Sequence, residues 1–583
     1  MTERKRRTLA EQEPTFVELF TPKLVTVLRE GYGAREFRAD AIAGLTVAIV
    51  ALPLSMAIAI ASGVPPAAGL VTAIIAGLLI SALGGSRYQV GGPAGAFIVL
   101  IGATVDKHGI DGMLLATMIA GLLLIAMGLL RLGTYVKLVP YPVTVGFTTG
   151  IAIIIMASQI KELLGLKLAA KEPGPLLEKF PALWQALPTA SPATIALSFS
   201  TIAIILGLRK LKPHWPGMLI AVIGTGLVVA LTGLDVETIH TRFGGISGAL
   251  GAPSLPAMSF AKLRAVMPEA IAFAMLGAIE SLLSAVVADG MTGRRHRSNC
   301  ELVGQGVANI AAGLFGGMCA TGTIARTATN VRAGAHGPVA GMLHAVFLAV
   351  FVLLLGGLAG YIPLAALAGV LAVVAWNMAE KRELATLVTA SRGDALVVLT
   401  TLFLTIFRDL TEAIVVGFAL GAVVFVNRMA KATGIERHEG LVDEDQADSA
   451  SRANMPFEAM LADHPDIAAY RISGAFFFGA AATLGAALDK IADTHKAFIV
   501  DFSAVPLLDS TAARTMHGTL QKAERRGVTV YLTGTNAAVR RELFLHDVRP
   551  PHVKYMARME DAIESWTERK AKASDVRDGG DAA

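Results

Sequence analysis

Charge and cysteine are both scarce in this sequence. Only 17% of the 583 residues are charged, 54% are hydrophobic, and the mean hydropathy is +0.58. A soluble protein of this length needs far more charged surface to cover its cores, so the composition excludes an ordinary soluble protein. The two cysteines, Cys300 and Cys319, are too few for a disulfide framework and form no zinc-binding pattern.

Catalytic, nucleotide-binding and export motifs are also missing. There is no phosphate-binding loop, no Gly-x-Gly-x-x-Gly and no hydrolase nucleophile elbow. The basic run Arg4–Arg7 is not followed by an apolar segment, so no cleavable signal peptide is visible. The net charge of +5 comes from basic residues in loops beside apolar blocks, which indicates membrane topology. We therefore expect no enzyme, no cofactor, no metal and no nucleic-acid partner.

Long apolar blocks fill most of the chain. A helix needs about 20 apolar residues to cross a hydrocarbon core of roughly 30 Å. About fourteen blocks are candidate spans, which predicts a polytopic α-helical membrane protein with the lipid bilayer as its surroundings. They are Ala41–Ala61, Ala67–Leu83, Ala94–Val105, Met113–Leu130, Val143–Ile160, Pro192–Leu208, Met218–Leu231, Ala270–Ala288, Val303–Phe315, Gly322–Arg332, Val339–Leu358, Leu364–Met378, Ala395–Phe407 and Ile414–Phe425.

Basic residues gather in the even-numbered connections between these blocks, for example Arg209, Lys210 and Lys212. The odd-numbered connections are mostly short or balanced by acidic residues, and Lys161–Lys179 is the exception. The positive-inside rule then predicts that both termini are cytoplasmic. We expect a multi-pass protein of the inner (plasma) membrane.

Two blocks, Ala94–Val105 and Gly322–Arg332, are too short to cross as single helices, and each follows a Gly-rich stretch. Each is third in a set of seven. Short, Gly/Pro-interrupted segments at matching places in two halves indicate an inverted repeat with a transporter's midplane binding site. The alternative is that they are re-entrant loops or that the glycines only serve packing.

The starts of these two half-helices are candidate anion-binding groups, at Pro93–Ala96 and Thr323–Arg326. A helix N-terminus presents unpaired N–H groups and about half a positive charge, and small residues leave that backbone open to a ligand. Arg326 adds a permanent charge. An intramembrane arginine is a functional candidate, although a structural ion pair or an anchor facing the cytoplasm are alternatives.

Glu280 is a candidate coupling group, because no basic residue lies within a turn of it in its apolar block. Ser284 follows at i+4 on the same face. A carboxylate away from water is easily protonated, which suits a proton-coupling role; with Ser284 it could alternatively hold sodium, or be locked onto Arg326. Nearby, Glu301, Gln305 and Asn309 share one helix face, for which interhelical hydrogen bonding is the predicted role.

The pattern changes to alternating strands and helices near Met455, which predicts a small soluble α/β domain. Within it, Asp509 and Ser510 lie where a strand leads into a helix; either can cap that helix, or Ser510 can be phosphorylated or contact a partner. The expected domains are an N-terminal cytoplasmic segment (1–38), a transmembrane domain (39–432), an acidic linker (433–454), the α/β domain (455–568) and a disordered tail (569–583).

Several motifs occur in a fixed order along the chain. They are Leu45–Gly63, with Ala51-Leu52-Pro53 and Gly63-Val64-Pro65-Pro66; Glu280–Ser284 with Ala288-Asp289; Asn299–Asn309; Gly316-Gly317; Thr321-Gly322 leading into Ala325-Arg326-Thr327; and Val505-Pro506 to Thr511. Together they resemble the sulfate permease (SulP) family of anion transporters over about residues 15–570. The last motif resembles the family's C-terminal STAS domain, which is related to anti-sigma-factor antagonists.

The resemblance implies fourteen helices in a 7+7 inverted repeat, core and gate domains, a homodimer and elevator-like transport. It places the anion near Ala94, Gly95, Ala96, Phe97, Thr323, Ile324, Ala325 and Arg326, and the coupling ion at Glu280 and Ser284. Proton-coupled members often carry Glu at the position of Glu280, whereas sodium-dependent bicarbonate members tend to carry Asp. Symport of a sulfate-type anion with protons is therefore expected.

One departure from the family pattern keeps other substrates open. Many members have Gln after the first-helix proline and an aromatic residue four positions later, where this chain has Leu54 and Ile58. Sodium-coupled transport of bicarbonate or of a C4-dicarboxylate is thus the alternative. A protein of another class, a membrane-anchored sensor or scaffold whose STAS domain binds a protein partner, is the third possibility.

Overall fold

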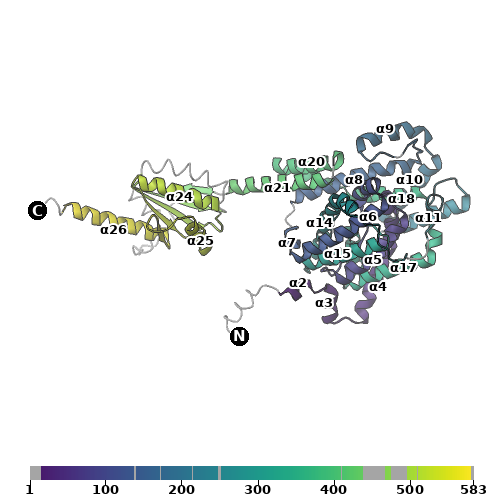
Figure 1. Ribbon diagram of the computed structural model, residues 1–583, viewed down its shortest axis with the longest axis horizontal. Helices are drawn as coiled ribbons and strands as arrows, with labels where there is room; N and C mark the ends of the chain where they lie inside the picture. The colour runs from purple at the N-terminus through teal and green to yellow at the C-terminus, as the bar shows by residue number, and fades with distance from the viewer. Residues whose placement is uncertain are drawn as a thin grey trace. The chain divides into compact units, whose positions relative to one another are not determined.

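The structure is a computed structural model that describes residues 15–136, 140–170, 172–212, 215–246, 251–408, 410–432, 434–437, 466–474, 495–508 and 510–578. The chain divides into two units, Met1–Ala419 and Leu420–Ala583 (Figure 1), and each is considered by itself. Expected features that fall between these ranges, including most of the linker and Asp509, lie outside the described residues.

The first unit is helical. Its elements, with the last helix crossing the unit boundary, are α2 (Phe16–Phe20), α3 (Lys23–Arg29), α4 (Ala34–Ala61), α5 (Pro66–Leu83), β1 (Gly91–Gly92), η1 (Gly95–Phe97), α6 (Ile98–Leu129), α7 (Gly133–Val136), α8 (Tyr141–Leu164), α9 (Leu176–Ala186), η2 (Leu187–Thr189), α10 (Pro192–Leu211), α11 (Gly217–Thr232), α12 (Ile239–Phe243), α13 (Phe260–Ala265), α14 (Met267–Thr292), α15 (Ser298–Leu314), β2 (Thr321–Gly322), α16 (Ile324–Arg332), α17 (Val339–Ala359), α18 (Leu364–Met378), α19 (Lys381–Ala390), α20 (Arg392–Phe407) and α21 (Leu410–Ala432).

Proline and glycine mark many of these helix ends. Pro66 and Pro192 occupy the first position of α5 and α10, where a missing N–H costs no hydrogen bond. Gly165, Gly233 and Gly293 end α8, α11 and α14 in the left-handed conformation, which glycine adopts without a steric penalty. Local sequence therefore determines where the apolar helices start and stop.

Each of the fourteen expected blocks lies largely within a helix. Nine helices of the described residues are long and apolar enough to cross a membrane. The expected third and fourth spans are joined in α6, whose path is interrupted at Gly109 (φ 70°). The other four helices that contain expected spans are shorter: α11 and α20 have 16 residues each, α15 has 17 and α16 has nine.

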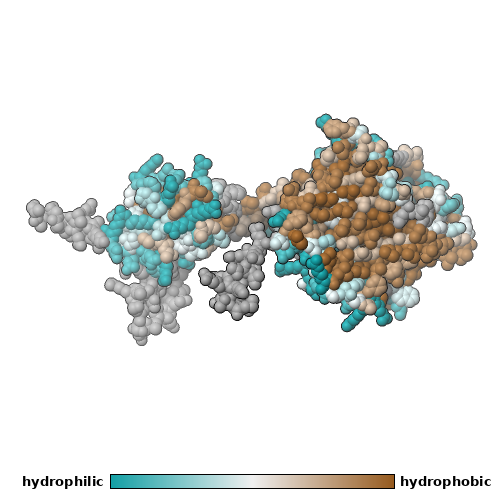
Figure 2. All heavy atoms as spheres, turned by 60° about the horizontal axis from the view of Figure 1, so that its bottom comes forward, coloured by the Kyte–Doolittle hydropathy of each residue, from teal (hydrophilic) through white to brown (hydrophobic). Residues whose placement is uncertain are grey.

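Apolar side chains cover much of the face of the helical unit seen in Figure 2. Leu353, Leu354 and Phe403 are among the large apolar residues that are more than half exposed. An apolar surface of this extent requires lipid or protein around it. The first unit is therefore the membrane-embedded part of the chain.

The long helices pack mainly within two sets. In the first set, α15 packs on α5 and α6, α17 packs on α4 and α5, and α14 packs on α6 and α16. In the second set, α8 packs on α18 and α20, and α10 packs on α11 and α18. Helices α11 and α18 also touch α4, which links the sets. The half-helices both belong to the first set.

The second unit is an α/β domain with a five-stranded sheet. Its strands are β3 (Gly434–Arg437), β4 (Ile467–Ser473), β5 (Ala497–Ala504), β6 (Thr529–Thr533) and β7 (Lys554–Met556), in that spatial order; β3 is antiparallel to β4 and the other pairs are parallel. One core lies between the sheet and helices α24 (Ser510–Arg525) and α25 (Ala537–Leu545), and a second core includes α26 (Met559–Asp578). The predicted alternation of strands and helices is confirmed for the described residues of this domain.

Helix α26 extends through most of the segment that the composition predicts to be a disordered tail. Residues 569–578 are helical in the structure, where the composition predicts a disordered tail from 569. Met559, Ala562 and Ile563 are buried against the sheet and start the helix. Once started, it continues through residues with high helix propensity such as Glu568, Arg569 and Lys570, and Lys570 Nζ lies 2.8 Å from Asp466 Oδ2.

A buried carboxylate joins the strands of this domain. Arg471 Nε donates to Asp501 Oδ2 at 2.7 Å, and the Ser503 N–H donates to Oδ1 at 3.0 Å. Thr533 Oγ1 on β6 donates to Oδ1 at 3.3 Å. Burial by itself raises the pKa of Asp501, but the hydrogen bonds from Arg471 and Ser503 outweigh it and hold the pKa below its ordinary value.

Asp501→Asn should therefore destabilise the α/β domain by about 1–3 kcal/mol, because buried donors lose a charged acceptor. A lowered pKa in the folded state means that the carboxylate stabilises the domain above the unfolded pKa of about 3.9 and stops doing so as pH falls through the folded value. Hydrogen exchange of the β5 amides against pH measures both effects. Asp547→Asn, at an exposed position, is the control; equal protection in both variants would contradict this role.

Candidate functional site

The two half-helices meet at a short antiparallel crossing. Strands β1 and β2 pair with Gly91 opposite Gly322 and Gly92 opposite Thr321. Thr323 donates to the Val90 carbonyl from its N–H at 3.1 Å and from its hydroxyl at 3.2 Å, and the Val90 N–H donates to Thr327 Oγ1 at 3.2 Å. Residues more than 200 positions apart are thus fixed side by side, immediately before η1 and α16 begin.

The glycines at this crossing are required by close contacts. A Cβ at Gly322 would lie 1.6 Å from Gln89 Nε2, and one at Gly91 would lie 2.2 Å from Ile80 Cδ1. Gly92 has φ 154°, and its Cβ would lie 2.1 Å from Arg326 Nη1. A side chain at any of these positions would displace Gln89, Ile80 or Arg326, which pack against the crossing.

Arg326 is completely buried beside the crossing. Its Nη2 donates to Ser55 Oγ of α4 at 3.0 Å and to the Pro93 carbonyl at 3.3 Å, at the start of the other half-helix. Its Nε and Nη1 have no hydrogen-bond partner among the described residues, and within the same part of the chain no carboxylate forms an ion pair with it. Arg326 therefore does not form, with any described residue, the structural ion pair that was the alternative to a functional role. Burying unpaired guanidinium N–H groups is costly, which points to a missing acceptor.

The predicted anion-binding residues lie together around this arginine, on two sides of the crossing. Ala94, Ala96, Phe97, Thr323 and Arg326 are buried, Gly95 and Ile324 are half-buried, and Ala325 is exposed. A Cβ at Gly95 would reach Ile155 of α8 at 3.6 Å and Met378 of α18 at 3.8 Å. The start of the first half-helix therefore faces the second set of helices.

Glu280 and Ser284 lie on α14, which packs against α16. Ser284 Oγ donates to Thr327 Oγ1 of α16 at 3.0 Å. Glu280 is 7% exposed and forms no ion pair within the described part of the chain, so it is not locked onto Arg326. Glu380, between α18 and α19, is close enough to interact with it electrostatically. Ser284 therefore contacts the second half-helix directly. Glu280 lies on the same helix without an ion pair among the described residues.

The polar face of α15 holds both segments that lead into the crossing. The Asn309 amide pairs with the Ala320 backbone, Nδ2 donating at 2.9 Å and Oδ1 accepting at 2.8 Å. Gln305 Nε2 and Gln89 Nε2 donate to Ser281 Oγ at 2.9 and 2.7 Å. The predicted interhelical hydrogen bonding is confirmed at Gln305, which bonds Ser281 of α14, whereas Asn309 holds the Ala320 backbone before β2.

Sequence reasoning missed four residues of the site: Ser55, Gln89, Ser281 and Thr327. Each is a polar residue in an apolar or Gly-rich stretch, and Ser281 and Thr327 directly follow the predicted Glu280 and Arg326. A rule that treats every polar residue within these apolar or Gly-rich segments as a candidate would have found them.

A cavity of about 1960 Å³ opens beside the site, between the two sets of helices. It is lined by Ile98 and Leu100 at the start of α6, directly after the predicted Phe97, and none of the eight predicted anion-binding residues lines it. Its rim carries both signs of charge. Lys107 Nζ lies 2.9 Å from Glu269 Oε1 within the first set.

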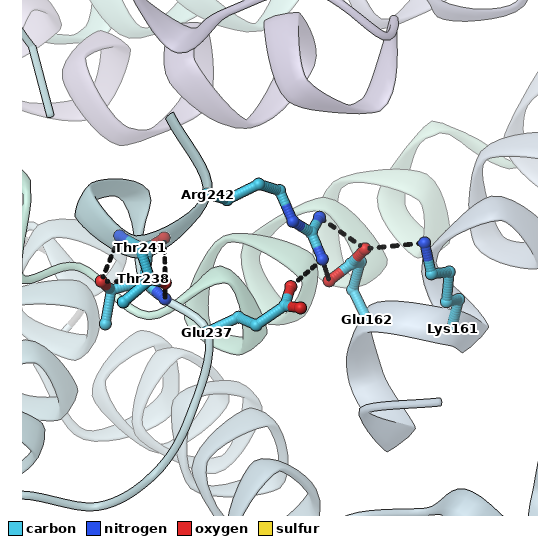
Figure 3. Close-up of polar contacts among 6 residues, drawn as sticks. All are labelled: Lys161, Glu162, Glu237, Thr238, Thr241 and Arg242. Carbon is cyan, nitrogen blue, oxygen red and sulfur yellow. Dashed lines mark hydrogen bonds and ion pairs between the residues drawn. The ribbon is translucent and has the colours of Figure 1, made fainter. Parts of the chain in front are cut away.

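Arg242 of α12 organises the opposite rim (Figure 3). It donates to both oxygens of Glu162 at the end of α8, at 2.8 and 3.3 Å, and also pairs with Glu237. Lys161 Nζ lies 3.8 Å from the same Glu162. A bridged pairing of Thr238 with Pro363 fixes this segment to the loop before α18. The rim charges are thus largely paired, so this cavity offers little free positive charge.

In the second unit, Ser510 is the first residue of α24. Its hydroxyl donates to Glu542 Oε1 of α25 at 2.7 Å, and its side chain is exposed. Asp509, the other predicted regulatory residue, lies outside the described residues. Because its side chain is exposed, Ser510 is accessible to a modifying enzyme.

An apolar helical unit in which two half-helices meet beside a buried, unpaired cation has the arrangement of a membrane transporter. The sulfate permease family model matches residues 37–401, and the STAS domain model matches residues 458–550. The chain belongs to the sulfate permease family and is a membrane anion transporter with a C-terminal STAS domain.

Individual relatives agree with this assignment. YvdB of Bacillus subtilis is 38% identical over 87% of this chain and 93% of its own length. The bicarbonate transporter BicA of Synechocystis is 32% identical over 87% and 90%. The solved structure of SLC26A9 superposes with a TM-score of 0.82 over 98% of this chain and 96% of its own, at 16% identity, which is a likeness of fold.

Proposed function

We propose that the chain is a secondary active transporter that moves a small inorganic anion of the sulfate type together with protons. The observation that carries the proposal is Arg326, buried at the crossing of two half-helices with two N–H positions unpaired. An anion there would accept hydrogen bonds from the guanidinium and from the first N–H groups of η1 and α16. The anion site would comprise Ala94, Gly95, Ala96, Phe97, Thr323, Ile324, Ala325 and Arg326.

Glu280 is proposed as the proton-coupling residue, with Ser284 as its neighbour in the site. A carboxylate that is buried without a cation is more stable when protonated. Ser284 is bonded to Thr327, one residue after Arg326, so a change at α14 is transmitted to the second half-helix. Proton and anion would thereby favour each other's binding.

The packing of the helices in two sets supports an elevator-like movement, with the first set as core and the second as gate. Anion-site residues lie on the first set, and Gly95 faces Ile155 and Met378 of the second. We further propose the 7+7 repeat of fourteen spans, a homodimer in the plasma membrane, and cytoplasmic termini. With that topology, the cavity rimmed by Arg242 opens on the outer side.

Sodium-coupled bicarbonate transport is the second candidate. It is favoured by the 32% identity to BicA, which is named as a bicarbonate transporter, and by Leu54, which offers no polar contact to sulfate. YvdB, by contrast, is named provisionally for sulfate. Transport of a C4-dicarboxylate is favoured by Leu54 alone, because that residue offers no polar contact to sulfate.

Uptake by proteoliposomes separates these candidates. Sulfate, bicarbonate, chloride and a C4-dicarboxylate are offered with an inward proton gradient, in sodium and in choline buffers. Sulfate uptake that requires the proton gradient and ignores the cation supports the proposal. Uptake that requires sodium and prefers bicarbonate would replace it by the second candidate.

Truncation after Ala453 tests whether the STAS domain is regulatory, with Ser510 as its proposed control point. If the transmembrane domain carries the flux, the truncated chain should retain uptake and lose only its regulation. Phosphate on Ser510 would be repelled by Glu542, at 2.7 Å from the hydroxyl. Absence of flux in both the full and the truncated chain, across the anion panel, would favour a membrane-anchored sensor or scaffold.

A further inference from the structure

A second intramembrane carboxylate, Glu301, has no part in the coupling proposed above. It lies in the first turn of α15 and has no exposed surface. The end of α5 closes over it, because a Cβ at Gly304 would lie 2.9 Å from the Gly84 backbone and one at Gly84 would lie 2.7 Å from Glu301 Oε2. Water has little room at this carboxyl group.

Several charged groups of the surrounding elements bond to residues other than Glu301. Arg297, on the turn before, donates to the Thr21 carbonyl at 2.8 Å and to Thr26 Oγ1 at 3.0 Å. Arg87 pairs with Glu30, and Asp289 of α14 pairs with His296 at 2.6 Å. Lys23 of α3, Arg294 and the Cys300 thiol also lie at this end of the helices. No basic residue in the described ranges forms an ion pair with Glu301.

Neutral groups supply the hydrogen bonds of Glu301. Its Oε2 accepts the Ser86 N–H at 2.9 Å, its Oε1 lies 3.4 Å from Ser281 Oγ and 3.3 Å from Gln305 Nε2, and the Gly85 backbone also hydrogen-bonds to the carboxyl group. Ser281 Oγ already accepts two amide N–H groups, so its single proton serves Glu301. The buried amide oxygens of Gln89 and Gln305 have no donor among the described residues.

Glu301 is more stable as the neutral acid in this enclosure. Burial without a cation penalises the charged form of a carboxylate, and hydrogen bonds from neutral donors offset that penalty only in part. The close contacts of Gly84 and Gly304, and the lack of an ion pair within the described ranges, therefore favour a protonated Glu301.

This cluster reaches the anion site through two residues. Ser281 receives the Gln89 amide, and Gln89 lies against Gly322 of β2 and directly precedes Val90, which bonds Thr323 and Thr327. A change in the charge of Glu301 would redistribute the donors at Ser281 and loosen Gln89. The effect would appear where the two half-helices begin.

We propose that Glu301 is held as a neutral carboxylic acid and, through Ser281 and Gln89, positions the crossing at which the anion binds. It is a positioning residue, distinct from the coupling residue Glu280. The positioning role rests on the proposed function, because it requires an anion at the crossing. The protonated state of Glu301 is independent of that function. Loss of the proton at alkaline pH weakens anion binding without removing any group that contacts the anion.

Infrared spectroscopy of the full chain in liposomes, without substrate, tests the proton. The difference spectrum of wild type and Glu301→Gln at neutral pH should contain the carbonyl band of a protonated carboxylic acid, and the band should persist in Glu280→Gln. Absence of that band, with Glu301→Gln melting at the wild-type temperature, overturns the proposal. Its presence upholds the protonated state even if no anion of the panel binds, in which case the proposed function fails alone.

Equilibrium binding of radiolabelled sulfate tests the positioning role, in the Glu280→Gln background so that Glu280 cannot titrate. Affinity should fall by up to about tenfold per pH unit once Glu301 ionises. Adding Glu301→Ala should weaken binding at every pH, and adding Glu301→Gln should restore most of the affinity while removing the alkaline decline. A decline that persists unchanged with Gln at 301 would contradict the role of this residue.

Discussion

Glu280→Gln is expected to abolish the stimulation of anion uptake by an inward proton gradient while leaving anion binding in place. The glutamine keeps the shape of the side chain but cannot exchange a proton. Coupling between two ligands is typically worth about 1–3 kcal/mol, or about 5- to 150-fold in affinity, and all of it should disappear. Counterflow of labelled anion without a gradient should continue, because Glu280 is not among the groups proposed to contact the anion.

The measurement is initial uptake by proteoliposomes at several imposed pH differences, followed by counterflow at equal pH. Glu178→Gln provides a matched control, because Glu178 is an exposed carboxylate on α9. Gradient dependence that survives in Glu280→Gln would assign coupling to another group. Loss of counterflow as well would show that Glu280 serves binding or folding and not coupling alone.

Gly92→Ala is expected to reduce both the stability of the crossing and its affinity for the anion. The added Cβ would lie 2.1 Å from Arg326 Nη1, in a backbone conformation (φ 154°) that other residues rarely adopt. Overpacking costs about 1–3 kcal/mol and backbone strain about 1–3 kcal/mol more. Either the guanidinium moves out of the crossing or the β1–β2 pairing opens, so anion binding should be lost together with stability.

Thermal unfolding with and without sulfate measures both parts. Gly224→Ala is the control, because a Cβ at Gly224 of α11 meets nothing within 4 Å, and its stability should change by less than about 1 kcal/mol. Gly92→Ala that melts like wild type and is still stabilised by sulfate would show that Arg326 and the crossing do not form the anion site.

The positions of the helices were largely readable from the sequence, since apolar length, proline at helix starts and glycine at helix ends are local signals. The two half-helices were found in the same way, because both depart from the length rule. The number of spans could not be read from apolar length in the same way. Helix α15 is polar along one face and α16 has only nine residues. Helices buried within protein do not need a fully apolar surface.

The partners of the site residues could not be read in advance. Arg326 and Glu280 were both identified, and pairing them was a reasonable alternative for two buried charges in one site. In the structure Arg326 instead bonds Ser55 and the Pro93 carbonyl, 271 and 233 positions away. The tail shows the same limit, because Met559 and Ile563 anchor α26 through contacts that composition does not record.

The sequence by itself determined that this chain is a multi-spanning membrane transporter of the sulfate permease family with a STAS domain, since lipid imposes length and hydropathy and the motifs keep their order. Only the tertiary structure decided that Gly91 pairs with Gly322, that Arg326 keeps unpaired N–H groups, and that Glu301 is enclosed without a cation. These properties depend on distances between segments more than 200 residues apart, and packing, not local propensity, sets those distances.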